Sequence, residues 1–223
     1  MRSRRARRVS VRVDTDRGVI VTLPLRVRAD EAERALRALD HWVQPRLAAL
    51  TARRTRISGL SDAGLPFLGE TLRLEPDPGR TSVTRVGEAL RVPADDEQRR
   101  RALVAWYRRQ ARDETLWRLD EAVDTLGVSY DRLRITDTRT RWGSCSTRGT
   151  ISLSWRLLLA PEACLDYVIW HEACHLVHAH HRPTFWRLLE QHRPDWRAPS
   201  GWLREHGADL RLWLSAPSPD ARG

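Results

Sequence analysis

Residues 171–175 have the sequence HEACH, which fits the pattern HExxH and decides how the rest of the chain is interpreted. Apolar residues recur around this motif at the spacing of one helix face: Leu165, Val168, Ile169, Leu176 and Val177. Pro161 suits the first position of a helix, where a missing N–H costs nothing. The pattern therefore predicts a helix from about residue 161 to about residue 179 that carries the motif.

The spacing of the two histidines predicts a metal site. Residues i and i+4 of a helix lie about 40° apart around the axis and about 6 Å apart along it, so His171 and His175 can bind one metal ion from one face. Glu172 flanks that face, which places a carboxylate near a metal-bound water. Zinc lowers the pKa of such a water to about 7, and Glu172 can accept its proton as the hydroxide attacks. The motif therefore predicts a zinc-dependent hydrolase with Glu172 as general base.

A catalytic zinc usually has three protein ligands and a water. The candidates for the third ligand are His178, His180, His181 and His192. His178 shares a face with His171 but lies about 10 Å farther along a straight helix, too far for one metal ion. His181 lies beyond the expected helix end, where a chain reversal before Pro183 would return it to the metal. We therefore prefer His181, while His178 and His180 can be solvated or can orient a ligand, and His178 is retained as a candidate substrate-binding residue.

The polar segment TRTRWGSCSTRG at 138–149 is expected to be a loop, and its residues 139–146 are a second candidate site. Arg139 and Arg141 can bind an anionic group or stabilise an oxyanion, and Trp142 can pack on a substrate. Alternatively, Arg141 and Trp142 only pin the loop to the helix that carries the motif, and both interpretations stay open. With three histidines available, Cys145 is expected to be a structural thiol.

The chain on both sides of the motif predicts a mixture of helices and strands. After residue 93 we expect helices at 95–126, 183–193 and 199–214, and strands at 132–137 and 150–155. Before residue 94 we expect a hairpin of 9–13 and 19–25, a helix over 30–53 that Pro45 kinks or splits, a turn-rich stretch at 54–66, and strands near 67–75, 81–86 and 89–92. These elements predict an α+β fold with a small β-rich module at 1–93, containing one helix, and a catalytic domain at 94–223.

Composition constrains the partners and the compartment. The 223 residues carry a net charge of +10, all of the basic residues being arginine, and a basic surface favours anionic partners. The absence of Lys and Asn indicates a GC-rich genome, so part of this charge reflects coding. No apolar run is long enough to span a membrane and the N-terminus lacks a signal-peptide pattern, so we expect a cytoplasmic protein with free thiols and no membrane association.

The chain resembles the YgjP-like metallopeptidases, relatives of the SprT-like zincins. The strings that carry this resemblance are TRTRWGSCSTRGTISLSWRLLLAP (138–161), DYVIWHEACHLVHAHHRPTFW (166–186) and PDWRAPSGWL (194–203). FLGETLRL (67–74) and AWYRRQA (105–111) also fit. The family usually has Asn, Leu and Ser where this chain has Ser154, Ala173 and Arg182, and none of these positions is a proposed ligand.

The resemblance implies a zincin-like domain with zinc on His171, His175 and a third histidine that maps to His181. It implies a peptide or an unfolded protein as the leading substrate. Members of the family have also been linked to nucleoside triphosphate pyrophosphohydrolysis, which makes a nucleotide the alternative substrate. A second alternative is a nucleic-acid-associated zinc-binding module, because the relatives make DNA association conceivable and arginines crowd residues 2–8.

Overall fold

The structure is a computed structural model that describes residues 1–14, 18–138 and 140–214, with the backbone alone at 54–63. The chain forms two compact units, of which one contains residues 1–60 and the other contains residues 61–214. Each unit is built from both helices and strands, which confirms the predicted α+β class. Among the described residues, no helix is long and apolar enough to cross a membrane.

The first unit contains a three-stranded sheet of β1 (Arg2–Ser3), β2 (Ser10–Asp14) and β3 (Gly18–Pro24). The strand order is β1-β3-β2, with β2 antiparallel and β1 parallel to β3. The predicted hairpin is therefore confirmed. It is followed by α1 (Asp30–Ala38) and α2 (Asp40–Ala63).

Two expectations for this region are wrong. The segment expected as one helix over 30–53 breaks at Leu39, where ψ is 10°, and Pro45, which was expected to kink or split it, does not split it but lies inside α2. Moreover, α2 continues through most of the stretch that was expected to be turn-rich. The helix ends before Gly64, whose φ of +134° suits glycine and ends the helical geometry.

The second unit begins with a four-stranded sheet. Its strands are β4 (Leu65–Phe67), β5 (Glu70–Asp77), β6 (Thr84–Val86) and β7 (Ala89–Pro93), in the order β4-β5-β7-β6. The long helix α3 (Asp96–Leu126) follows. Asp95 caps it by accepting a hydrogen bond from the Gln98 N–H at 2.7 Å, and Gly127 ends it with a φ of +64°.

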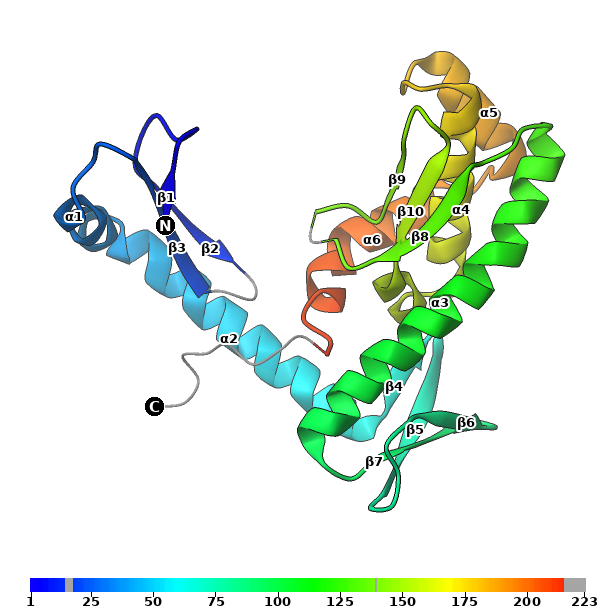
Figure 1. Cartoon of the computed structure of the whole chain (residues 1–223), viewed down its shortest axis with the longest axis horizontal. Coiled ribbons are helices and arrows are strands. Elements are labelled where there is room, and N and C mark those ends of the chain that lie inside the picture. The colour runs from blue at the N-terminus through cyan, green and yellow to red at the C-terminus, as the bar shows by residue number, and fades with distance from the viewer. Residues whose placement is uncertain (15–17, 139, 215–223) are drawn as a thin grey trace. The chain divides into compact units, whose positions relative to one another are not determined.

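The buried face of α3 ties both sheets of this unit together (Figure 1). The Tyr107 hydroxyl donates to the Pro66 carbonyl at 2.6 Å, and α3 also contacts β7 and β8 (Arg132–Thr136). Residues 61–93 therefore belong to the same compact unit as the C-terminal half. The two units divide at residues 60 and 61, whereas the sequence predicted a division after residue 93.

The second sheet has the order β8-β10-β9, with β10 (Thr150–Ser154) between β8 and β9 (Gly143–Cys145). β10 is parallel to β8 and antiparallel to β9. The sequence did not predict β9, because the short segment Gly-Ser-Cys lacks the apolar alternation of a strand. Pairing with β10, from Gly143 opposite Leu153 to Cys145 opposite Ile151, makes it a strand.

Four helical segments complete the unit: η1 (Trp155–Leu159), a 3-10 turn, and the helices α4 (Glu162–Val177), α5 (Pro183–His192) and α6 (Arg197–Leu210). α4 is the predicted helix of the HExxH motif, and it ends two residues earlier than expected. It packs against α3, α5 and α6 and against β9 and β10. This central position explains why Ile169, Ala173 and Cys174 are fully buried.

Candidate metal centre

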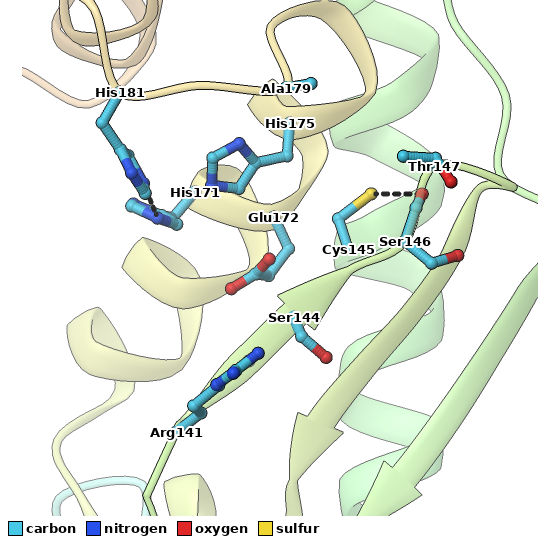
Figure 2. Close-up of a pocket in the computed structure, with 11 residues that line it drawn as sticks. Arg141, Ser144, Cys145, Ser146, Thr147, His171, Glu172, His175, Ala179 and His181 are labelled. Carbon is cyan, nitrogen blue, oxygen red and sulfur yellow. Dashed lines mark hydrogen bonds between the residues drawn. The ribbon is translucent and has the colours of Figure 1, made fainter.

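Three histidines come together where α4 ends (Figure 2). His171 and His175 project from α4, and His181 comes from the segment between α4 and α5. One ring nitrogen of each lies within 4.8 Å of the other two, and the Nε2 atoms of His171 and His181 are 3.0 Å apart. The structure thus places together the three residues that the sequence proposed as ligands.

The chain reversal that returns His181 has a local cause. At His178 the backbone turns extended (φ −129°, ψ 103°) and ends α4, and Pro183 then begins α5. The Trp186 indole N–H donates to the His181 carbonyl at 3.1 Å, and its ring stacks on the imidazole with the ring centroids 5.4 Å apart. Trp186 therefore fixes both the backbone and the ring of His181.

Phe185 supplies the apolar floor of the cluster. Its fully buried ring lies 4.9, 4.5 and 4.7 Å from the ring centroids of His171, His175 and His181. Phe185 and Trp186 were not predicted as site residues. The sequence feature that could have identified them is Pro183, which begins a helix two residues after His181. A helix that begins there places the next two aromatic residues beneath that histidine.

The backbone of His178 orients His175. The His175 Nδ1 lies 3.0 Å from the His178 carbonyl oxygen. Because a carbonyl only accepts, Nδ1 carries the proton, and the lone pair of Nε2 is available to a metal. The His178 imidazole is not among the residues that line the pocket, so its predicted contact with substrate stays a prediction.

Burial disfavours the charged form of two of the histidines. Burial first, and then the neighbouring His175 and His181, lower the pKa of His171 to about 3. The pKa of His181 is also lowered, first by burial and then by the nearby histidines. The Nδ1 of His171 is buried and has no hydrogen-bond partner within the described chain. Neutral imidazoles are the form that a metal ion requires.

Glu172 is held close to these rings, and only 5% of its surface is exposed. Burial raises the pKa of its carboxyl to about 7, although the charge of Arg141 and a hydrogen bond from the backbone of Cys145 lower it. Gly143 of β9 touches this carboxyl, because a Cβ there would lie 2.5 Å from the Glu172 Oε1. The missed strand β9 therefore confines the candidate general base.

A pocket of about 420 Å³ opens between α4 and β9 (Figure 2). The residues that line it are Arg141, Gly143, Ser144, Cys145, Ser146, Thr147, His171, Glu172, His175, Ala179 and His181. Five of the predicted site residues therefore line one cavity: His171, Glu172, His175, His181 and Arg141. Arg139 lies outside the described residues.

Trp142 packs away from this cavity. A Cβ on Gly207 of α6 would lie 2.7 Å from its ring, and the Arg211 guanidinium lies 4.4 Å from the ring centroid. Arg211 also donates to the Thr138 carbonyl at 3.0 Å. Packing accounts for the position of Trp142, and its predicted contact with substrate stays a prediction.

Cys145 lines the pocket as a half-buried thiol. Its Sγ donates to the Ser146 carbonyl at 3.5 Å. Burial raises its pKa, and the nearby Glu172 raises it further. A thiol that resists ionisation is a poor nucleophile and a poor metal ligand, in agreement with a structural role.

The comparison with protein families identifies this architecture. The sequence model of the YgjP-like metallopeptidase domain matches residues 7–206. The chain belongs to the YgjP-like family. The match spans most of both compact units, so the similarity of this YgjP-like protein to its family extends well beyond the helix that carries the HExxH motif. Membership of a metallopeptidase family supports a metal-dependent hydrolase, and the three histidines could hold its metal.

Individual relatives add little to the family match. No curated protein matches the YgjP-like chain. The crystal structure of the metallopeptidase zymogen of Pyrococcus abyssi abylysin shares 29% identity and covers 42% of this chain and 92% of its own. The TM-score of 0.36 is too low for that structure to describe this fold.

Proposed function

We propose that this protein is a zinc-dependent peptidase that uses Glu172 as general base. One observation carries the proposal: a buried carboxylate and three convergent imidazoles line a single pocket. A carboxylate beside three imidazole ligands is a common arrangement in enzymes that catalyse metal-assisted hydrolysis. The family adds the class of reaction, because it is a family of metallopeptidases.

The donor set fits zinc. Three neutral imidazole nitrogens suit this ion, and tetrahedral binding at about 2.1 Å needs ligand atoms about 3.4 Å apart. The 3.0 Å between the Nε2 atoms of His171 and His181 is close to that spacing. When bound, zinc supplies Lewis acidity that brings the pKa of a coordinated water to about 7 and polarises a carbonyl.

Glu172 would move the proton. With a pKa of about 7, its carboxyl can accept a proton from water and return it to a leaving amine near neutral pH. Gly143 and the backbone of Cys145 hold this carboxyl on the pocket side of α4. The carbonyl of His178 and the ring of Trp186 keep the imidazoles in place during the reaction.

The position of β9 favours an extended peptide as substrate. Among the described strands, β9 pairs only with β10, so it is an edge strand, and its residues line the pocket. An extended peptide can add to such an edge through backbone hydrogen bonds. This arrangement would lay the peptide along β9 with a peptide bond close to Glu172.

Nucleoside triphosphate hydrolysis is the second candidate. The observation that favours it is the Arg141 guanidinium in the pocket, because guanidinium groups bind phosphates well. The test presents purified zinc-loaded protein with unfolded proteins, peptides and each nucleoside triphosphate. Release of phosphate or pyrophosphate without proteolysis, lost in Glu172→Gln, would reverse our ranking.

The residue roles are tested by two sets of variants. We expect Glu172→Gln to retain one zinc per chain and lose hydrolysis, while Glu190→Gln, the same change on the exposed surface of α5, keeps both. Retained activity in Glu172→Gln would exclude the general base. Full zinc occupancy in the double variant His171→Ala, His175→Ala, measured by elemental analysis, would contradict the ligand assignment.

A further inference from the structure

We propose that Arg141 forms a recognition site for an anionic group in this pocket, so that the enzyme prefers peptides with a carboxylate within about two residues of the scissile bond. The proposal rests on the peptidase function proposed above and names the class of substrate. Three observations support it: the charge of the pocket, the lack of a hydrogen bond or ion pair for the Arg141 guanidinium within the described residues, and the way the Arg141 backbone is held.

The pocket offers an anion one cationic side chain and no exposed carboxylate. Among its lining residues, Arg141 is the only Arg or Lys and Glu172 is the only acidic residue. Glu172 is only 5% exposed and its carboxyl lies against Gly143, so an entering ligand meets little of it. The other lining residues are the candidate metal ligands and small neutral residues. A negatively charged group that enters meets Arg141 without an exposed competitor.

The guanidinium of Arg141 has no hydrogen bond or ion pair within the described residues. Figure 2 shows the side chain directed toward the Glu172 carboxyl. It therefore lies on the path of a substrate that reaches the candidate general base.

Other arginines of the same compact unit are paired when they lie against the core. The buried Arg156 binds both carboxylate oxygens of Asp137, at 2.6 and 3.2 Å, and Arg193 binds both oxygens of Asp166. Arg141 differs from both, because it is exposed, lines the pocket and has no carboxylate partner at hydrogen-bond distance among the described residues. A guanidinium in that situation is available for a carboxylate of a ligand.

The backbone of Arg141 is fixed by groups other than its own side chain. Its carbonyl accepts a hydrogen bond from the Thr138 hydroxyl at 2.8 Å, and the next carbonyl, of Trp142, accepts one from the Ser154 N–H at 2.8 Å. The Trp142 ring is packed against Gly207. These contacts already pin the loop, so the guanidinium is not needed for that purpose and is presented from a rigid support.

The distance along the chain limits where the carboxylate lies in a substrate. Arg141 precedes Gly143, which touches Glu172, by two residues, and two residues of extended chain span about 6.6 Å. A peptide aligned with β9 would therefore place a side chain within about two residues of the scissile bond beside Arg141. A free C-terminal carboxylate at that distance has the same chemistry.

The test uses zinc-loaded full-length protein and fluorogenic peptides that differ at one position on either side of the scissile bond. Each position carries Glu or the uncharged Gln, and a further pair carries a C-terminal acid or amide. We expect kcat/KM to be about tenfold higher for the acidic member at one position, as for a charge-assisted hydrogen bond. The position that responds distinguishes an acidic side chain from a C-terminal carboxylate.

Two variants assign the preference to Arg141. In Arg141→Gln we expect the ratio of kcat/KM between the acidic and the uncharged peptide to fall to about one, and in Arg141→Glu we expect the preference to invert toward peptides with Lys. Arg148→Gln, a matched change at an exposed position outside the pocket lining, should keep the wild-type preference. Zinc content and Tm verify that each variant is folded.

The outcomes separate this proposal from the proposed function. Cleavage of peptides with no charge preference at any position would overturn the anion site alone. Equal loss of kcat/KM for acidic and uncharged peptides in Arg141→Gln would also overturn it, because Arg141 would then act on the reacting centre or on the fold. If no peptide is cleaved by the wild-type protein, the peptidase function fails, and this proposal fails with it.

Discussion

His171 and Glu172 are adjacent residues whose pKa values move in opposite directions for the same reason. Burial lowers the pKa of His171 to about 3 and raises that of Glu172 to about 7, because low-dielectric surroundings disfavour the charged form of each. In the metal-free site both groups therefore favour their neutral forms. Perturbed pKa values of titratable groups that line one pocket are typical of functional sites.

These opposite shifts predict how the stability of the metal-free protein depends on pH. His171 has a lower pKa folded than unfolded, so its contribution to the free energy of unfolding is complete above pH 6.5 and is lost as the pH falls. Glu172 has a higher pKa folded, so its penalty is relieved as the pH falls from about 7 to 4.5. Between pH 7 and 5, stability should therefore fall less steeply in His171→Gln and more steeply in Glu172→Gln than in the wild type. Urea unfolding at several pH values measures both slopes, and identical slopes in all three proteins would contradict this assignment.

Gly143 offers a second test at the scale of single residues. A methyl group there would lie 2.5 Å from the Oε1 and 2.7 Å from the Cγ of Glu172, so Gly143→Ala must displace the carboxyl. We expect kcat to fall at least about 100-fold while zinc content is kept, because a displacement of about 1 Å at a catalytic group has effects of that size. The double variant Gly143→Ala, Glu172→Gln should be no less active than Glu172→Gln alone. An additive loss would show that Gly143 acts through another group.

At the scale of elements, α6 positions β9 from outside the pocket. Trp142 connects them, because its ring fills the space left by the missing side chain of Gly207 and lies beneath Arg211, while its carbonyl accepts from the Ser154 N–H of β10. Arg156 adds a second connection from the segment after β10 to the Leu210 carbonyl at the end of α6. The edge strand that confines Glu172 is thus supported by a helix far along the chain.

The two glycines of α6 provide a matched pair for testing this support. A Cβ on Gly207 would lie 2.7 Å from the Trp142 ring, whereas a Cβ on Gly201 would meet nothing closer than 3.8 Å. We expect Gly207→Ala to lower the free energy of unfolding by about 1–3 kcal/mol through overpacking. Gly201→Ala should be neutral or raise it by about 0.5–1 kcal/mol, because alanine reduces the entropy of the unfolded chain. Chemical denaturation compares the variants, and equal effects of the two changes would refute the packing argument.

At the scale of the whole molecule, charge is distributed unevenly between the compact units. Residues 1–60 contain 15 of the 39 basic residues and 6 of the 29 acidic residues, so they account for +9 of the net +10. Within this unit Arg4, Arg5, Arg7 and Arg8 are exposed. We propose that any association with nucleic acid belongs to this unit, because phosphate backbones bind arginine through charge alone.

This distribution predicts the behaviour of two shortened proteins. A fragment of residues 61–214 should bind one zinc and lose most affinity for single-stranded DNA, because its net charge is close to zero. Removal of residues 1–8, which contain five arginines, should weaken DNA binding and reduce its dependence on salt concentration. Titrations at several salt concentrations measure both effects. Unchanged affinity after removal of residues 1–8 would exclude the N-terminal arginines.

The sequence by itself determined the elements that depend on local periodicity. The helix expected at 95–126 agrees with α3 within one residue, and the histidine spacing of α4 follows from the geometry of a single helix. His181 could also be chosen from the sequence, since the helix start at Pro183 limits where the chain turns back. These features need only neighbours along the chain, so their physical causes are visible in the residues.

Only the tertiary structure decided the features that depend on distant partners. β9 is too short and too polar to be a strand alone, and it exists because β10 pairs with it and α6 anchors Trp142. The division at residues 60 and 61 was not visible either, because α3 joins residues 65–93 to the C-terminal half by packing. The contact of Gly143 with Glu172 could not be predicted for the same reason. The two residues lie in segments that are far apart in the sequence, and the pattern within each segment does not show that they meet.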